Sequence, residues 1–358
     1  MKILVEVTCG YPLPTFEAYC GGEHRYKLET ARLLALMGHS VVVAFEPYNT
    51  EWQAYGVRGV NWADAVKDDY DLYISSEGFM IEHLTNVPIS KKYAFCLGTP
   101  SVVKPQDTKR IIGYNEGGIV WAEENRYTAS YLPFPMRNLD ERPERNRRVI
   151  LASASEMFIE IGAHFALDVY DEIRRDNYFG DDYSDYDLEL HLYYSSLWRE
   201  GYRGHLARGG NGENSVEDQK EYMLMWDNWI DNPPTGVTFF DTVNYDVYMK
   251  VLASSGYFMG YRREAPNPPV LAASMFYGTP TISFDGAIHF TQKGYISIPK
   301  QFSDQTAIQL FKETIMALNS NQDDWEVMSH LAKTAAYPIF GETACSERWN
   351  QILERDFQ

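Results

Sequence analysis

The chain has 358 residues, of which 45% are hydrophobic, 23% charged and 15% aromatic, and its formal net charge at pH 7 is −18. This length favours two domains of ordinary size, and the composition excludes a chain that is disordered throughout. The acidic balance disfavours a general nucleic-acid-binding protein, which needs basic surface to neutralise phosphates.

The cysteines, histidines and apolar runs exclude several further features. The four cysteines lack the spacing of a metal site or redox motif and are too few for a disulfide framework. The eight histidines have no metal-ligand spacing, so no metal site is expected. No window approaches 18 uninterrupted apolar residues, so no membrane span is expected. The starting segment MKILVEV is too short for the apolar region of a signal peptide, and a cytoplasmic protein is the simplest interpretation.

The first 136 residues alternate short apolar runs with helical patterns. Residues 2–7 (KILVEV) are typical of a buried parallel strand. After a loop rich in glycine and proline, residues 24–38 have helical spacing that ends at a glycine cap. Further elements are predicted as strands at 40–45, 71–76, 92–97 and 110–114 and as a short helix at 62–67. This alternation predicts an α/β doubly wound domain.

A charged run that begins with prolines separates this pattern from a second cycle. Residues 137–147 are expected to be a linker, and a strand is predicted to follow directly. The second cycle is predicted to contain strands at 148–154, 187–194, 236–240, 257–261 and 281–284 and helices at 160–174, 244–255, 270–277, 304–318 and 322–336. We therefore expect domains at 1–136 and 148–338, each a doubly wound sheet. The remaining residues, 339–358, are expected to form a helix that buries Trp349 against the first domain.

Two motifs in this order of elements resemble a known family. After the first strand, Gly21-Gly22 precede a helix that ends in Gly38-His39 and leads into the second strand. Late in the second cycle, Glu264 precedes a helix that is followed by Gly278-Thr279-Pro280. Both blocks resemble the GT-B glycosyltransferases, and the second resembles their retaining, family-4-like members. The resemblance implies two Rossmann-like domains facing across a cleft, with the acceptor on the first domain and a nucleotide-diphosphate sugar on the second. It also implies no cofactor and no metal.

The same resemblance implies a set of site residues. Glu264 is the expected catalytic carboxylate, because a carboxylate at a helix mouth can accept hydrogen bonds from sugar hydroxyls. Arg262 and Arg263 are expected near the diphosphate, which arginine binds bidentately and which the helix N-terminus also attracts. The other expected donor-binding residues are Gly21, Gly22, Gly278 and Thr279.

Three positions depart from the family pattern. Ala273 stands where a second Glu binds the ribose, Leu97 where many relatives have a His, and Glu160 about where a Lys meets the diphosphate. The scaffold therefore matches better than the chemistry does. A glycosyltransferase is the first hypothesis, and a non-catalytic GT-B-like protein that binds a partner or ligand is the second.

A third hypothesis is a bacteriophage-type glycosyltransferase that acts on modified DNA bases. The segment 195–212 (SSLWREGYRGHLARGGNG) gathers Arg199, Arg203 and His205 with aromatic residues in an otherwise acidic chain. As a solvated loop it needs no explanation. As an acceptor-binding element, its aromatics would stack on sugars or bases and its arginines would meet phosphates. The acceptor stays open among a glycan, a small molecule and a modified nucleic acid.

Overall fold

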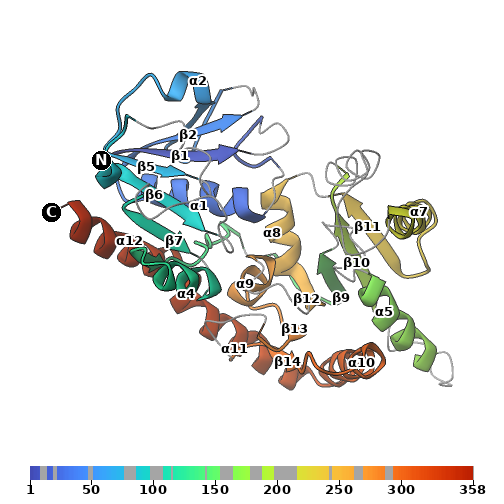
Figure 1. Ribbon diagram of the computed structural model, residues 1–358. Helices are drawn as coiled ribbons and strands as arrows, with labels where there is room; N and C mark the ends of the chain where they lie inside the picture. The colour runs from blue at the N-terminus through green and yellow to red at the C-terminus, as the bar shows by residue number, and fades with distance from the viewer. Residues whose placement is uncertain are drawn as a thin grey trace. The chain divides into compact units, whose positions relative to one another are not determined.

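The protein is described by a computed structural model as two compact units (Figure 1). The described residues are 1–8, 14–18, 22–46, 51–75, 86–96, 108–113, 116–141, 143–153, 164–177, 188–196, 216–241, 244–261, 269–286 and 293–357. The first unit consists of Met1–Asn138 and Tyr337–Gln358, and the second of Leu139–Ala336. The chain therefore leaves the first unit after Asn138 and re-enters it at Tyr337.

The first unit is built on an eight-stranded sheet with the order β3-β4-β2-β1-β5-β6-β7-β8. Its strands are β1 (Lys2–Thr8), β2 (Ser40–Glu46), β3 (Trp52–Ala54), β4 (Val57–Asn61), β5 (Leu72–Ser75), β6 (Lys92–Cys96), β7 (Arg110–Gly113) and β8 (Ala129–Tyr131). All neighbours are parallel except β3 and β4. The helices are α1 (Gly22–Leu36), α2 (Trp62–Ala65), the 3₁₀ turn η1 (Ile89–Lys91), α4 (Glu116–Glu124) and α12 (Glu342–Phe357).

The short hairpin β3–β4 was not predicted from the sequence. Its two-residue turn, Tyr55-Gly56, has φ values of 52° and 77°, a conformation usually signalled by Asn-Gly or Asp-Gly. Trp52 faces Gly59 across the hairpin, and a Cβ on Gly59 would lie 2.2 Å from the indole. The glycine therefore leaves room for the tryptophan ring, which also stacks on Phe45.

Helix α12 closes the first unit. Trp349 is 1% exposed on its inner face, and the helix packs against α1. At its end, Asp356 accepts two hydrogen bonds from the Arg110 guanidinium, at 2.6 and 2.7 Å, and one from the Tyr93 hydroxyl at 2.5 Å. At its start, Glu342 pairs with Arg32 of α1. Ion pairs therefore attach both ends of α12 to this unit, and the one at its end is buried.

The second unit is built on a six-stranded, all-parallel sheet with the order β11-β10-β9-β12-β13-β14. Its strands are β9 (Asn146–Ser153), β10 (Glu189–Tyr194), β11 (Val237–Asp241), β12 (Ser255–Gly260), β13 (Thr281–Phe284) and β14 (Ile296–Ile298). The helices are α5 (His164–Asn177), α7 (Val216–Asp231), α8 (Tyr245–Ser254), α9 (Pro269–Phe276), α10 (Asp304–Ser320) and α11 (Gln322–Phe340), which includes the boundary at Tyr337. Its core gathers Phe165, Phe284 and Phe311, whose ring centroids lie 5.4–5.7 Å apart.

Strand β9 begins at Asn146, inside the charged run that was expected to be a linker. The guanidinium groups of Arg145 and Arg147 lie 5.3 and 5.4 Å from the Trp325 ring of α11. Arg147 also donates to the last carbonyls of α10, at Leu318 and Asn319. Arginines that look like solvated charge in the sequence therefore pack on an aromatic side chain and bind a helix C-terminus.

Within the described parts of the chain, none of the helices has the length and apolar content that a bilayer span requires.

Candidate functional site

The candidate site lies at the carboxyl edge of the second sheet, where the strand order reverses. From β9 the chain first builds outward through β10 and β11, and then returns to the other side of β9 with β12. Open α/β sheets bind ligands in the crevice outside such a switch point. The two strands that flank it end at Ser153 and Gly260.

The backbone at this edge is tightly held. Tyr261, the residue after β12, donates its hydroxyl to the carbonyl of Ser153 at the end of β9. Ser283 of β13 donates to the carbonyl of Gly260 at 2.9 Å. A Cβ on Gly260 would lie 2.7 Å from that serine hydroxyl, so this position has no room for a side chain. Side-chain hydrogen bonds thus connect the ends of the three central strands β9, β12 and β13.

Helices α5 and α9 are the next described elements after β9 and β12. Because a helix that follows a strand in a parallel sheet runs back along it, the N-termini of both helices lie at this same edge. Neither helix has an acidic residue in its first turn. The other described helices of the second unit each have at least one there: α7, α8, α10 and α11. The first turns of α5 and α9 therefore carry no acidic side chain that would oppose an anion at these helix N-termini.

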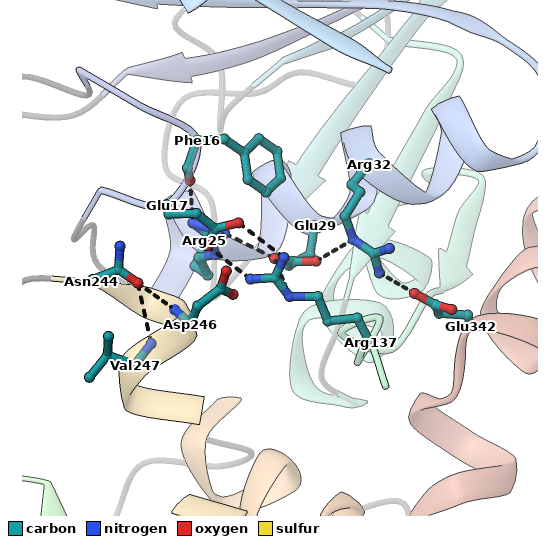
Figure 2. A network of polar contacts seen from close by, with 10 residues as sticks. All are labelled: Phe16, Glu17, Arg25, Glu29, Arg32, Arg137, Asn244, Asp246, Val247 and Glu342. Carbon is teal, nitrogen blue, oxygen red and sulfur yellow. Dashed lines mark hydrogen bonds and ion pairs between the residues drawn. The ribbon is translucent and has the colours of Figure 1, made fainter. Parts of the chain in front are cut away.

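Helix α8 shows the contrast. Its N-cap Asn244 accepts hydrogen bonds from the amides of Asp246 and Val247, at 2.9 and 3.2 Å (Figure 2). Asp246 adds a carboxylate to the first turn. This helix end already has its own acceptors and is not an open anion site.

His164, the first residue of α5, was not singled out by the sequence. Its Nδ1 lies 3.1 Å from the Tyr222 hydroxyl of α7, and the two rings meet edge to face. The contact fixes the imidazole at the start of a helix whose first turn lacks acids. In the sequence, a histidine directly before the apolar positions of a predicted helix is the signal that could have marked His164 as a candidate site residue.

Gly278 and Thr279 lie at the opposite, amino end of β13. Gly278 has φ +75° and closes α9, with its amide bonded to Met275 and that of Thr279 bonded to Ser274, both at 2.8 Å. The Thr279 hydroxyl donates to the carbonyl of Leu252 at 2.6 Å. These contacts support a role in holding the turn rather than direct contact with a donor. Ala273 is 1% exposed in the same helix and offers no side-chain group to a ribose.

Several expected site residues lie outside the described residues. Among them are Glu264, Arg262 and Arg263, which belong to the segment that joins Tyr261 to Pro269, and Gly21, Arg199, Arg203, His205, Leu97 and Glu160. Gly22 is the first residue of α1. In the described part of the chain, no group of His, Cys, Asp and Glu side chains could hold a metal ion.

The first unit contains a buried charge network that the sequence did not reveal (Figure 2). Glu29 of α1 is fully buried between Arg25 and Arg32, at 3.0 and 2.8 Å. Burial by itself would raise the pKa of Glu29, but the guanidinium groups of Arg25, Arg137 and Arg32 outweigh it and lower the pKa below its ordinary value. The carboxylate therefore stays ionised in the interior.

Comparison with known proteins identifies the fold. No family model matches the chain, and no curated protein does. Sucrose-phosphate synthase from Thermosynechococcus elongatus matches with a TM-score of 0.68 at 12% identity, over 99% of both chains. An alpha-glucosyltransferase in complex with UDP and a 13-mer DNA containing a HMU base matches with a TM-score of 0.65 at 12% identity, again over 99% of both chains. HepE from Anabaena, in complex with UDP and glucose, matches with a TM-score of 0.62 at 12% identity, over 99% of this chain and 100% of that one. These likenesses confirm the predicted GT-B fold of two Rossmann-like domains.

The glycine that closes α9 can be tested against a second glycine of the same conformation. Gly278 and Gly286 have φ values of 75° and 71°, but a Cβ at Gly278 would lie 3.0 Å from Arg145 Nη2 and from the Ser329 carbonyl, whereas one at Gly286 meets nothing within 4 Å. We expect Gly286→Ala to lower the free energy of unfolding by about 1–2 kcal/mol, the cost of the left-handed conformation. Gly278→Ala should cost about 1–3 kcal/mol more through overpacking. Urea denaturation of both variants measures the difference, and equal losses would contradict a tightly packed turn.

The buried carboxylate of Glu29 predicts a pH-dependent stability. Because its pKa is lowered in the folded state, its contribution is fully present above the unfolded value, near 4.5, and is lost as the pH falls through the folded pKa. Glu29→Gln removes the negative charge that Arg25, Arg32 and Arg137 share and should cost about 3–5 kcal/mol at neutral pH. The difference from the parent should shrink as the pH falls below that unfolded value.

Urea denaturation at a series of pH values measures this difference, with Glu354→Gln on the exposed side of α12 as a control. A Glu29→Gln difference that does not change with pH would show that this carboxylate is not ionised in the folded protein.

Proposed function

We propose that this chain, which has the GT-B fold, is a glycosyltransferase that moves a sugar from a nucleotide-diphosphate donor to an acceptor. The observation that supports this most is the pair of helix N-termini without acids at the switch point of the second sheet. A donor of this class presents a diphosphate, which the positive dipole end of a helix favours. Two of the similar structures were solved with UDP bound, which fits such a donor.

The donor chemistry is proposed for the segment between Tyr261 and Pro269. Glu264 would accept hydrogen bonds from the sugar hydroxyls, and Arg262 or Arg263 would meet the diphosphate. This segment begins at the end of β12, beside the switch point, which is where a donor would bind in an open α/β sheet. The proposed reaction needs no protein nucleophile and no metal. Positioning, together with electrostatic stabilisation of the leaving diphosphate, would lower the barrier.

His164 is proposed as a donor-binding residue that the family pattern does not include. A cation or hydrogen-bond donor is needed where relatives place Arg and Lys, and this chain has Glu160 there instead. The imidazole at the start of α5 is oriented by Tyr222 and can donate a hydrogen bond to a phosphate oxygen. Nucleotide recognition would then rely on helix amides and this ring, since Ala273 cannot bind the ribose through its side chain.

The acceptor is proposed to bind to the first unit, whose own sheet reverses between β1 and β5. Gly21-Gly22, which precede or begin α1 after β1, stay proposed for the donor, whose close approach they would allow. Arg199, Arg203 and His205 are proposed for the acceptor as well. The acceptor class stays open among a glycan, a small molecule and a modified nucleic acid.

Two alternatives compete with this proposal. A non-catalytic GT-B-like binding protein would explain the departures at Ala273, Leu97 and Glu160. A glycosyltransferase acting on DNA is favoured by the similarity to the alpha-glucosyltransferase solved with a DNA 13-mer. The net charge of −18 disfavours it, because duplex binding requires basic surface along the phosphates.

Nucleotide binding can be tested by thermal or urea stabilisation with UDP, ADP and GDP. A nucleotide at 100 times its dissociation constant should add about 2.7 kcal/mol to the free energy of unfolding. His164→Gln should weaken the affinity about tenfold, in the range of one hydrogen bond to a charged group. His191→Gln, on β10 and paired with Glu189, is the matched control and should leave it unchanged. Absence of stabilisation by every nucleotide would favour the binding-protein alternative, and equal behaviour of both variants would remove His164 from the site.

The role of Glu264 can be tested by Glu264→Gln, which keeps its size and removes its charge. Loss of a contact made only in the transition state should lower kcat, whereas loss of a ground-state contact should raise KM for the donor with kcat unchanged. We expect kcat/KM to fall by about 10- to 100-fold, equivalent to about 1.4–2.8 kcal/mol. Steady-state transfer assays measure this, and unaltered kinetics would exclude Glu264 from the site.

A further inference from the structure

We infer that Arg137 is a positioning residue that fastens the segment after β1 to the point where the chain leaves the first unit. Its guanidinium binds Glu17 through two parallel hydrogen bonds, Nη1 to Oε1 at 3.0 Å and Nη2 to Oε2 at 2.9 Å. The two side chains are 10% and 16% exposed. A bidentate pair of this kind fixes orientation as well as distance. The expected effect on catalysis rests on the proposed function, whereas the structural coupling does not.

Glu17 belongs to the described segment 14–18, between β1 and α1. Arg25 of α1 also holds this segment, with Nη1 donating to the Phe16 carbonyl at 2.6 Å and Nη2 lying 3.4 Å from Glu17. Arg25 also pairs with Glu29. Segment 14–18 is therefore bound both by the first helix and by Arg137, at the side of the sheet where β1 ends.

Tyr55 adds the β3–β4 turn to the segments that contact residues 14–18 and Arg137. It occupies a left-handed position of the β3–β4 turn, which Asn, Asp or Gly fills at lower cost. Its ring lies 5.1 Å from Phe16 and 5.2 Å from the Arg137 guanidinium. Burial and a hydrogen bond with Glu17 raise the pKa of Tyr55. The side-chain contacts give a reason for a tyrosine at a position that its backbone disfavours.

Arg137 is also the last buried residue before the chain leaves the unit at Asn138. Its neighbour Met136 donates its amide to the Phe340 carbonyl at 2.7 Å and bridges to Gly341. The outgoing chain thus pairs with the returning chain. The next residue, Glu342, reaches Arg32, which shares Glu29 with the rest of the network.

These ion pairs join four segments of the first unit through three arginines and three glutamates (Figure 2). The segments are residues 14–18, α1, the outgoing chain at Arg137 and the start of α12. Buried ion pairs contribute little net stability compared with apolar packing, and their use as devices of orientation is better attested. Under the proposed function, Arg137 sets the position of the chain beside the switch point of the first sheet, where the acceptor is expected. Its loss should change how the acceptor binds more than it changes the donor.

The test compares two arginines of the same unit that each bind a carboxylate bidentately. Arg137→Lys keeps the positive charge but cannot make the two parallel hydrogen bonds to Glu17. Arg110→Lys makes the same change in the pair with Asp356, at the amino edge of the sheet. We expect Arg137→Lys to accelerate amide hydrogen exchange in residues 14–18 by about tenfold, and Arg110→Lys to leave it within about twofold. Glu17→Gln should reproduce the effect of Arg137→Lys, and the double variant should add little to either. Equal exchange in both arginine variants would overturn the inference.

Kinetics provides a second readout. Arg137→Lys should raise KM for the acceptor about tenfold while stabilisation by the donor nucleotide stays within about twofold of the parent. A parallel loss of donor binding, or an unchanged acceptor KM, would contradict a positioning role in the reaction. If the parent protein neither transfers sugar nor binds a nucleotide, the proposed function fails, while the exchange experiment still decides whether Arg137 positions this segment.

Discussion

The direction of the chain in a parallel sheet is the constraint on which this protein depends. Each helix that follows a strand must run back along it, so strand ends, loops and helix N-termini gather at one edge. In the second unit this brings α5 and α9 to the reversal between β9 and β12. At that edge the Tyr261 hydroxyl donates to the Ser153 carbonyl and so connects the ends of β9 and β12. The absence of acids in the first turns of these two helices is the feature with the clearest chemical meaning, because no carboxylate there opposes the attraction of the helix dipole for an anion.

Charge inside the first unit has a different purpose. Three arginines and two further glutamates surround Glu29 in one network. A separate pair of Arg110 and Asp356 attaches the end of α12. Taking such groups out of water is costly, and the cost is offset only where each charge is paired with good geometry. Both clusters satisfy this condition with bidentate or multiple contacts. They connect segments that lie far apart in the sequence, which apolar packing alone would specify less precisely.

The departures from the glycosyltransferase pattern are explained in part by the fold. Ala273 is buried in α9, and the Thr279 hydroxyl donates to the backbone carbonyl of Leu252. These two residues therefore contribute to packing and to the turn after α9. A donor-binding site in this chain would depend on helix amides, His164 and the segment after β12. Under the proposed function this combination would alter nucleotide recognition, and nucleotide binding discriminates such an enzyme from a protein that has lost its site.

The sequence by itself determined the fold class and most of the long elements. The buried runs at β1 and β2 and the glycine that ends α1 are local signals, because strand burial and helix termination depend on residues close together in the chain. The hairpin β3–β4 was missed because its turn holds a tyrosine whose cost is offset by contacts with Phe16 and Arg137, which are distant in sequence. Arg145 and Arg147 look like linker charge in the sequence, and only the fold brings both guanidinium groups against the Trp325 ring. The Glu29 network and the meeting of two helix N-termini at the switch point were decided only by tertiary structure. An ion pair between α1 and α12, or the sharing of one sheet edge by α5 and α9, has no signature in local sequence.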